Sequence, residues 1–131
     1  MIRALVQDAG EGAGVRLIGH IPDAELPALY AGARLFLYPS LYEGFGLPVL
    51  DAMACGTPVL CSNAASRPEA GGDAALMLDP KDENSWADAM FRMSDDGEWH
   101  KEYRKRGISH AAGFSWERAA GEVIAVYEEM V

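Results

Sequence analysis

The sequence predicts an α/β domain in which helices cover a parallel β-sheet. Short apolar runs alternate with helical patterns at close spacing, and each run is hydrophobic almost throughout, as strands buried on both faces are. Three helical patterns then follow one another at the end of the chain. The predicted strands are residues 15–19, 33–39, 57–62 and 74–79.

Two short helices are predicted between the first three strands. Asp23 is the expected N-cap of the first, which ends near residue 32, and Pro27 falls within its first turn, where a missing N–H does little harm. The second has Pro48 at its expected first position and stops at Gly56. Proline at the start and glycine at the end is the asymmetry typical of helices.

Three longer helices are predicted after the last strand. Asp82 can cap one that ends near residue 95, a second covers residues 99–112, and Ser115 begins the third. The third helix carries an apolar stripe at helical spacing, made of Trp116, Ala119, Val123, Val126 and Tyr127.

Composition limits the class of protein. A chain of 131 residues is one domain that can bury a core without covalent links. No apolar run is long enough to span a membrane and the first ten residues lack the apolar block of a signal peptide, so a cytoplasmic chain is predicted. Cys55 and Cys61 are interpreted as small apolar residues, and no spacing of cysteine and histidine indicates a metal site.

Charge argues against nucleic acid as a partner. Twenty acidic against eleven basic residues give a net charge of −9, whereas binding to phosphates needs clustered lysine and arginine. The one basic cluster, residues 101–106, is interrupted by acidic residues and is interpreted as a solvated helix face.

The stretch "YPSLYEGFGLPVLDAMACGTPV" (residues 38–59) has the features of a binding site. Its loop leaves the carboxyl end of the strand at residues 33–39, where ligands of parallel sheets bind. Gly44 and Gly46 permit close approach, and the helix that follows presents unpaired N–H groups. Glu43 and Asp51 can accept hydrogen bonds from hydroxyls. The combination suits a sugar and a ribose around a diphosphate.

A simpler interpretation remains open from spacing alone. The two glycines would form a tight turn, Glu43 would be a surface acid, and Asp51 would complement the dipole of its own helix from the first turn. A flavodoxin-like or dinucleotide-binding module also fits the alternating pattern, but the chain lacks Gly-x-Gly-x-x-Gly after a first strand.

The segment "PSLYEGFGLPVLDAMACGTPVLCSN" closely resembles the donor-binding signature of retaining GT-B glycosyltransferases of the family 4 type. The resemblance extends over nearly the whole chain, through "VRLIGHIPDAELPALYAGARLFLYPS", "SRPEAGGDAALMLDPKDENSWADAM" and "FSWERAAGEVIAVYEEM". It implies a three-layer Rossmann-like sheet with C-terminal helices, forming a single partial donor-binding domain over residues 1–131 without the acceptor domain. The implied reaction is retaining sugar transfer from a nucleotide diphosphate sugar, mannosyltransferase-like in polysaccharide or cell-envelope synthesis, without metal or cofactor.

The resemblance also assigns roles. Glu43 matches the acid that contacts the transferred sugar and stabilises charge at its anomeric carbon, and is the implied catalytic residue. Asp51 matches the glutamate that holds the ribose hydroxyls, one methylene shorter. The remaining donor-binding positions are Gly44, Phe45, Gly46 and Leu47 at the sugar and diphosphate, and His20 and Ile21 at the base.

The chain also departs from the family pattern. The family's acceptor domain, and the two strands whose loops carry an Arg and a Lys for the diphosphate, have no counterpart, so the chain alone is expected to be inactive. One edge of the strand at residues 33–39 is expected to be unpaired, which favours self-association or a partner chain that supplies the missing half. A folded, self-associating fragment without catalytic function is the alternative. The acceptor is unknown, and peripheral membrane association of a full-length enzyme is possible.

Overall fold

The sheet of this protein has three parallel strands. The computed structural model describes residues 14–42, 44–64, 68–94 and 97–130. Strands β1 (Phe36–Tyr38), β2 (Val59–Ser62) and β3 (Leu76–Leu78) lie in the order β1-β2-β3. Leu60 of β2 pairs with Leu37 on one side and Leu76 on the other. Three of the four predicted strands are therefore confirmed, each shorter than predicted.

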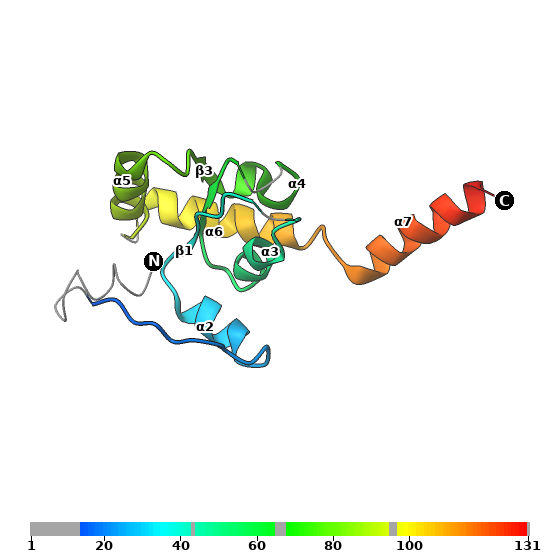
Figure 1. Ribbon diagram of the computed structural model, residues 1–131, viewed down its shortest axis with the longest axis horizontal. Coiled ribbons are helices and arrows are strands. Elements are labelled where there is room, and N and C mark those ends of the chain that lie inside the picture. The colour runs from blue at the N-terminus through cyan, green and yellow to red at the C-terminus, as the bar shows by residue number, and fades with distance from the viewer. Residues whose placement is uncertain (1–13, 43, 65–67, 95–96, 131) are drawn as a thin grey trace.

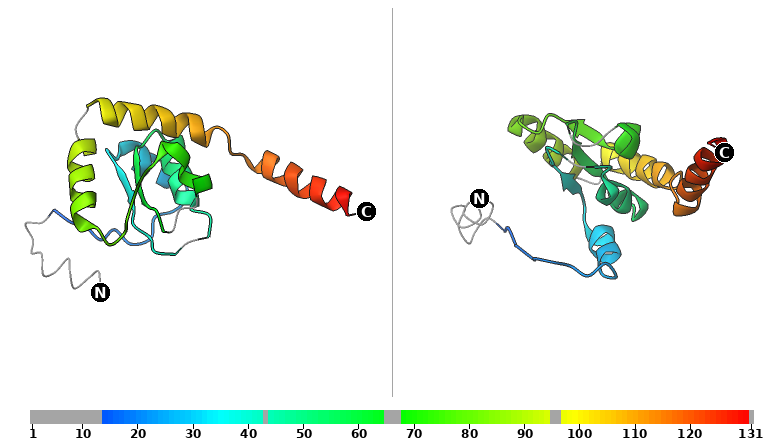
Figure 2. Two further views of the ribbon diagram at one scale, coloured as in Figure 1. Left: turned by 90° about the horizontal axis from the view of Figure 1, so that it is seen from above. Right: turned by 45° about the vertical axis from the view of Figure 1, so that its right-hand side comes forward.

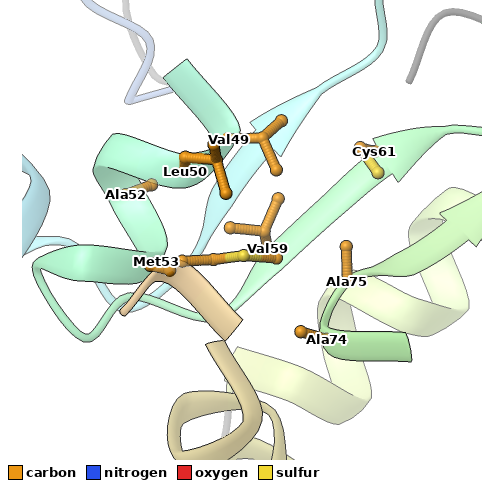
Figure 3. Close-up of a cluster of buried hydrophobic side chains, with 9 residues drawn as sticks. Val49, Leu50, Ala52, Met53, Val59, Cys61, Ala74 and Ala75 are labelled. Atoms are coloured by element: carbon orange, nitrogen blue, oxygen red, sulfur yellow. The ribbon is translucent and has the colours of Figure 1, made fainter. Parts of the chain in front are cut away.

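The central strand carries the core on both of its faces, because successive side chains of a strand point in opposite directions. Val59 and Cys61 pack beneath helix α3 (Leu47–Ala54), which contributes the fully buried Met53 (Figure 3). Leu60 points to the other face, where helix α5 (Glu83–Ser94) covers the sheet. The predicted three layers of helix, sheet and helix are thus observed.

Helix α5 is fixed at its start as the sequence predicts. The carboxylate of Asp82 accepts hydrogen bonds from the backbone N–H of Ser85 at 3.1 Å and from its hydroxyl at 2.6 Å. Farther along, the Trp86 indole donates to the Asp79 carbonyl at 2.9 Å. Trp86, Ala89 and Met93 are buried against Leu60 and close the second core cluster.

Helix α6 (Glu98–Ala111) is hydrogen-bonded at both ends to the sheet unit, by which we mean the three strands and the residues next to them, with α3, α4 (Pro68–Gly71) and α5. His100 Nε2 donates to the Arg34 carbonyl at 3.0 Å, and His110 Nε2 donates to the Ala70 carbonyl at 3.1 Å. Between them Gly107 lies against Met53, where an added Cβ would be 3.1 Å from the Met53 Cγ. The glycine lets the two helices approach closely.

The predicted strand at residues 15–19 is wrong. This segment forms no strand, its residues are exposed, and it runs past helix α2 (Leu26–Gly32) outside the sheet (Figures 1 and 2). A buried strand needs neighbours that satisfy its backbone and cover its side chains, and no described strand pairs with this one. The predicted N-cap of α2 is also wrong, because Glu25 rather than Asp23 occupies that position and makes no side-chain cap bond.

Two short elements that the sequence analysis did not predict lie between β2 and β3. Helix α4 (Pro68–Gly71) and a 3-10 turn, η2 (Gly72–Ala74), connect the loop after β2 to β3. The fully buried Ala70 of α4 and the buried Ala74 of η2 join the sheet unit. Their small residues give no helical periodicity, which is why the sequence did not reveal them.

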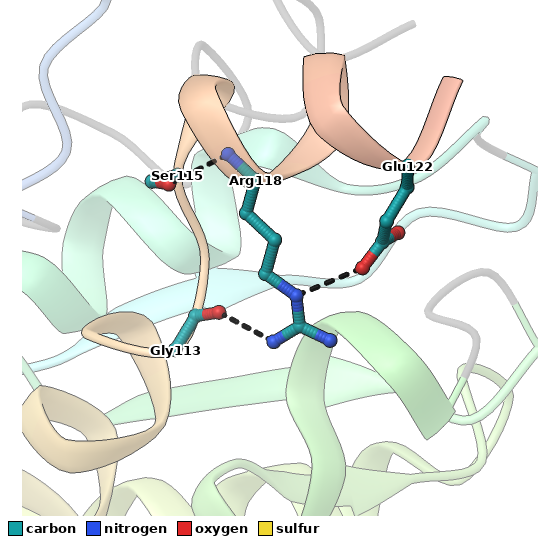
Figure 4. A network of polar contacts seen from close by, with 4 residues as sticks. All are labelled: Gly113, Ser115, Arg118 and Glu122. Atoms are coloured by element: carbon teal, nitrogen blue, oxygen red, sulfur yellow. Dashed lines mark hydrogen bonds and ion pairs between the residues drawn. The ribbon is translucent and has the colours of Figure 1, made fainter. Parts of the chain in front are cut away.

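The last helix, α7 (Trp116–Glu129), begins at Ser115 as predicted. Ser115 Oγ accepts from the Arg118 N–H at 3.1 Å, and the Arg118 guanidinium donates to the Gly113 carbonyl at 3.1 Å and to the Glu122 carboxylate at 2.9 Å (Figure 4). Every residue of α7 is exposed, and the helix extends away from the rest of the molecule (Figures 1 and 2).

Candidate functional site at the carboxyl rim of the sheet

The candidate site begins where β1 ends. The rim loop, residues 39–46, leaves the carboxyl end of β1 and leads directly into α3. Its tip is open to solvent, with Tyr42 92% exposed and Leu41 64% exposed. Because all three strands are parallel, this is the rim at which open α/β sheets bind ligands.

Gly46 sets the direction of α3. It is the N-cap residue, with φ of +92° in the left-handed region, and no side chain caps the start of the helix by a hydrogen bond. A Cβ placed there would lie 3.7 Å from the Cβ of Ala70, an ordinary van der Waals distance, so space would allow a side chain. The glycine is required by its backbone angle, and the helix start that it leaves uncapped presents N–H groups and the positive end of the dipole.

Asp51 lies on the solvent side of α3, one turn beyond Leu47. The first turn of α3 contains no acidic residue, so the simpler interpretation of Asp51 as a partner of the helix dipole from that turn is wrong. Asp51 is instead near Tyr30 of α2. Burial, followed by the negative charge of Asp51, raises the pKa of the Tyr30 hydroxyl.

Tyr30 is held firmly in this position. Its carbonyl accepts a hydrogen bond of 2.6 Å from the buried Thr57 hydroxyl, and its ring meets that of Phe36 edge-on at 5.2 Å between centroids. Sequence analysis gave Tyr30 no role and did not predict that the charge of Asp51 would act on it. Only the packing of α2 against α3 brings the two residues together.

The other predicted residues are distributed around this rim. Glu43 lies outside the described residues. Gly44 is exposed with no atom within 4 Å of an added Cβ, whereas Phe45 is half-buried against the core. Leu47 is 48% exposed at the first position of α3. His20 is exposed and Ile21 half-buried, in the segment just before α2.

Two further aromatic residues contact this rim from the other end of the chain. Phe114, in the turn between α6 and α7, lies 6.1 Å from the ring of Phe45 between centroids, and His110 lies 5.1 Å from Phe114. Sequence analysis gave neither a role. The signal that could have found them is weak, because one aromatic residue in a turn is compatible with many packings.

The described residues include no group of three or more metal-binding side chains. Cys55 and Cys61 form no disulfide with one another and are half-buried and buried respectively, as their apolar interpretation predicts. A hollow of about 610 Å³ lies beside β3 and α6, and none of the predicted donor-binding residues lines it. Within the described part of the chain, no helix has the length and apolar character needed to cross a membrane.

Comparison with known proteins gives one consistent result. Residues 1–110 match the family "Glycosyl transferases group 1". The chain is 44% identical over 124 residues to O-antigen chain mannosyltransferase B of Escherichia coli, an alignment that covers 95% of this chain and 32% of that protein. The chain thus spans about a third of the length of this relative.

Solved structures agree in fold. Sucrose-phosphate synthase from Thermosynechococcus elongatus superimposes with a TM-score of 0.83 at 33% identity, over 98% of this chain and 33% of that one. The C-terminal domain of a glycosyl transferase group 1 family protein (LpcC) from Francisella tularensis does so with a TM-score of 0.73 at 27% identity, over 86% of this chain and 59% of that one. The chain belongs to the group 1 glycosyl transferases and corresponds to the C-terminal portion of a GT-B enzyme of this family.

Proposed function

We propose that this chain binds the nucleotide diphosphate sugar donor of a retaining glycosyltransferase, and that a mannosyl donor for polysaccharide or cell-envelope synthesis is the first candidate. The observation that carries the proposal is the position of Asp51. It lies on the open side of α3, beyond the first turn, where the helix dipole does not explain it, and its charge contributes to the raised pKa of Tyr30. The mannosyl assignment rests on the name of the 44% identical relative.

The proposed roles follow the path of the donor along α3. Glu43 contacts the transferred sugar, and the backbone of Gly44, Phe45, Gly46 and Leu47 meets its hydroxyls and the diphosphate at the uncapped start of the helix. Asp51 accepts hydrogen bonds from the ribose hydroxyls, with the protonated Tyr30 hydroxyl as a neighbouring donor. His20 and Ile21 contribute backbone groups to the base.

Calorimetry with GDP, UDP, GDP-mannose and UDP-glucose tests these roles separately. Asp51→Asn should weaken the binding of nucleotide and nucleotide sugar alike, about ten- to hundredfold, because the loss of a charge-assisted hydrogen bond costs on the order of 1.5–3 kcal/mol. Glu43→Ala should weaken nucleotide sugar while leaving the free nucleotide unchanged.

The matched control is Asp88→Asn, an exposed acid-to-amide change on α5 on the other side of the sheet. It should leave every affinity unchanged. Absence of heat with all four ligands at millimolar concentration would contradict the proposal. We expect no sugar transfer by this chain alone, since none of its eleven basic residues lies in a motif that matches the family's diphosphate-binding pair.

Self-association without catalysis is the second candidate, and one observation favours it. β1 is an outer strand of the described sheet, and the apolar residues of α7 are exposed. Light scattering that shows a dimer in the absence of any ligand, together with calorimetry that detects no nucleotide, would support this candidate. A monomer would count against it.

A further inference from the structure

Three segments distant in the sequence meet beside the start of α3. They are the end of the rim loop at Phe45, helix α4 at Ala70, and the end of α6 with its following turn at His110 and Phe114. Phe45 also packs against the core cluster beneath α3. The common neighbour of these segments is the loop whose backbone is proposed to bind the donor.

His110 connects two of these segments. Its Nε2 donates to the Ala70 carbonyl at 3.1 Å, and its ring lies over Gly72, where an added Cβ would be 2.8 Å from the His110 Cε1. Ala70 is fully buried, and its Cβ would be 3.7 Å from a Cβ added to Gly46. The histidine therefore holds α4 at the place where it neighbours the left-handed turn at Gly46.

Phe114 connects the third segment to the loop itself. Its ring lies between those of His110 and Phe45, 5.1 Å and 6.1 Å away between centroids. The Phe45 ring is confined between Phe114 and the core. Phe45 and Gly46 are adjacent. If the Phe45 ring and the Gly46 backbone are both held in place, the peptide group between these two residues is held in one orientation as well.

The turn that carries Phe114 is itself well anchored. Gly113 and Phe114 donate to the carbonyls of His110 and Ala111, both at 3.0 Å, and Arg118 donates from α7 to the Gly113 carbonyl (Figure 4). Phe114 is 40% exposed, so burial alone is a weak reason for its position. The aromatic contacts and the ordered turn explain it better.

We propose that Phe114 and His110 are positioning residues for donor binding, which hold the rim loop in its binding conformation through Phe45 and Ala70. This inference rests on the proposed function. Neither residue contacts the donor: Phe114 acts on the Phe45 ring, and His110 acts on Phe114 and on the Ala70 carbonyl. Their removal should therefore loosen the loop without unfolding the domain.

The first measurement needs no ligand. Amide hydrogen exchange, followed by NMR, reports local opening of the backbone. In Phe114→Ala the amide of Val49, which donates to the Gly46 carbonyl at the end of the rim loop at 2.9 Å, should exchange several-fold faster than in the wild type, while amides of β2 remain unchanged. In Phe114→Tyr, which keeps the ring, exchange should return to the wild-type rate.

The second measurement is the affinity for GDP-mannose and UDP-glucose by calorimetry. Phe114→Ala should weaken the nucleotide sugar that binds the wild type about two- to tenfold, the range expected for one lost aromatic pair. Phe114→Leu should lose about as much affinity as Phe114→Ala, because leucine supplies apolar bulk but lacks the ring that contacts Phe45. His110→Gln, which keeps a donor for the Ala70 carbonyl and loses the ring, should weaken binding less than His110→Ala.

Two controls separate positioning from general stability. Phe91→Ala removes an 81% exposed phenylalanine on α5 and should change neither loop exchange nor affinity. Met93→Ala removes a fully buried side chain from the opposite face of the sheet. It should lower the melting temperature and leave donor affinity unchanged.

Unchanged loop exchange in Phe114→Ala would overturn the inference, and so would faster exchange without any loss of affinity. An equal loss of affinity in Met93→Ala would also overturn it, because the effect would then be one of overall stability. The wild type could bind neither nucleotide sugar while Phe114→Ala still exchanges faster in the loop. That result would contradict the proposed function and support the contact between the turn and the loop.

Discussion

Strand β2 is mostly apolar and helix α7 carries an apolar stripe, but the structure buries only the strand. All four residues of β2 are buried, with Val59, Leu60 and Cys61 completely inaccessible. In α7 no residue is buried, although Trp116, Val123 and Tyr127 follow one stripe and are 77%, 55% and 67% exposed. The difference is in what surrounds each element.

The comparison teaches that an apolar pattern specifies the type of element and leaves its partner open. β2 is enclosed by strands on both edges and by helices on both faces. Within the described residues, the hydrogen bonds that tie α7 to the preceding turn lie at its first turn, in the Ser115 cap and the contact of Arg118 with Gly113. A helix of 14 residues with local contacts alone is marginal in water. Removal of side chains should therefore have very different effects in the two regions.

The largest effect is expected in the buried unit. Met53→Ala should destabilise the protein by about 2–5 kcal/mol, because a fully buried side chain between α3, β2 and α6 leaves a cavity that the core closes only in part. Chemical denaturation with a two-state fit measures it. A loss below about 1 kcal/mol would show that this part of the core is far more adaptable than its packing indicates.

A smaller loss of stability is expected at Gly46, where the rim loop leads into α3. Gly46→Ala should cost about 1–2 kcal/mol, because an alanine at φ of +92° is strained even where space is sufficient. Gly44→Ala is the matched change two residues away, at a glycine without positive φ and with open space around it. It should leave stability unchanged or slightly raised, and similar losses in both variants would refute the strained-turn explanation.

The pH dependence of stability tests the cap of α5. Hydrogen bonds from Ser85 lower the pKa of Asp82 below its ordinary value. A lowered folded-state pKa means that the contribution is present above the unfolded pKa of about 3.9 and is lost as the pH falls through the folded value. Melting temperatures should fall more steeply between pH 5 and pH 3 in the wild type than in Asp82→Asn, which can still cap but does not titrate in this range. Equal slopes would exclude a role for the charge.

The smallest effect is expected in α7. Val123→Ala should change the stability of this chain by less than about 0.5 kcal/mol, because the side chain is already half in water and contacts no described core cluster. Denaturation under the conditions used for Met53→Ala gives a direct comparison. A loss above about 1 kcal/mol that grows with protein concentration would reveal that the stripe is covered by another copy in solution.

Sequence patterns predicted those parts of the fold that are governed by local chemistry. Strand positions followed from continuous apolar runs, and the starts of α5 and α7 followed from Asp82 and Ser115, whose side chains bond to nearby N–H groups. The strand predicted at residues 15–19 failed because strands depend on neighbours, which a local pattern does not reveal. α4 and η2 were missed because four and three residues are too few to show a period.

The candidate site divides in the same way. The rim loop, the glycine at the start of α3 and the presence of Asp51 could be predicted, since they depend on order along one strand, one loop and one helix. The nearness of Tyr30 to Asp51, and of Phe114 and His110 to Phe45 and Ala70, could not. These pairs are 21 to 69 residues apart in numbering, and only the docking of α2 and α6 on the sheet unit brings them together.

The sequence by itself determined the class of fold, the parallel strands that it contains and the family signature at the rim. These features depend on residues that are neighbours in the sequence, such as the continuous apolar runs of buried strands and the glycines of turns. Tertiary structure decided which apolar segments are covered, with β2 enclosed and α7 exposed, and which side chains support the rim loop. The physical reason is that hydrophobic burial and ring contacts depend on surfaces that meet in space, and their energy appears only once both partners have been positioned.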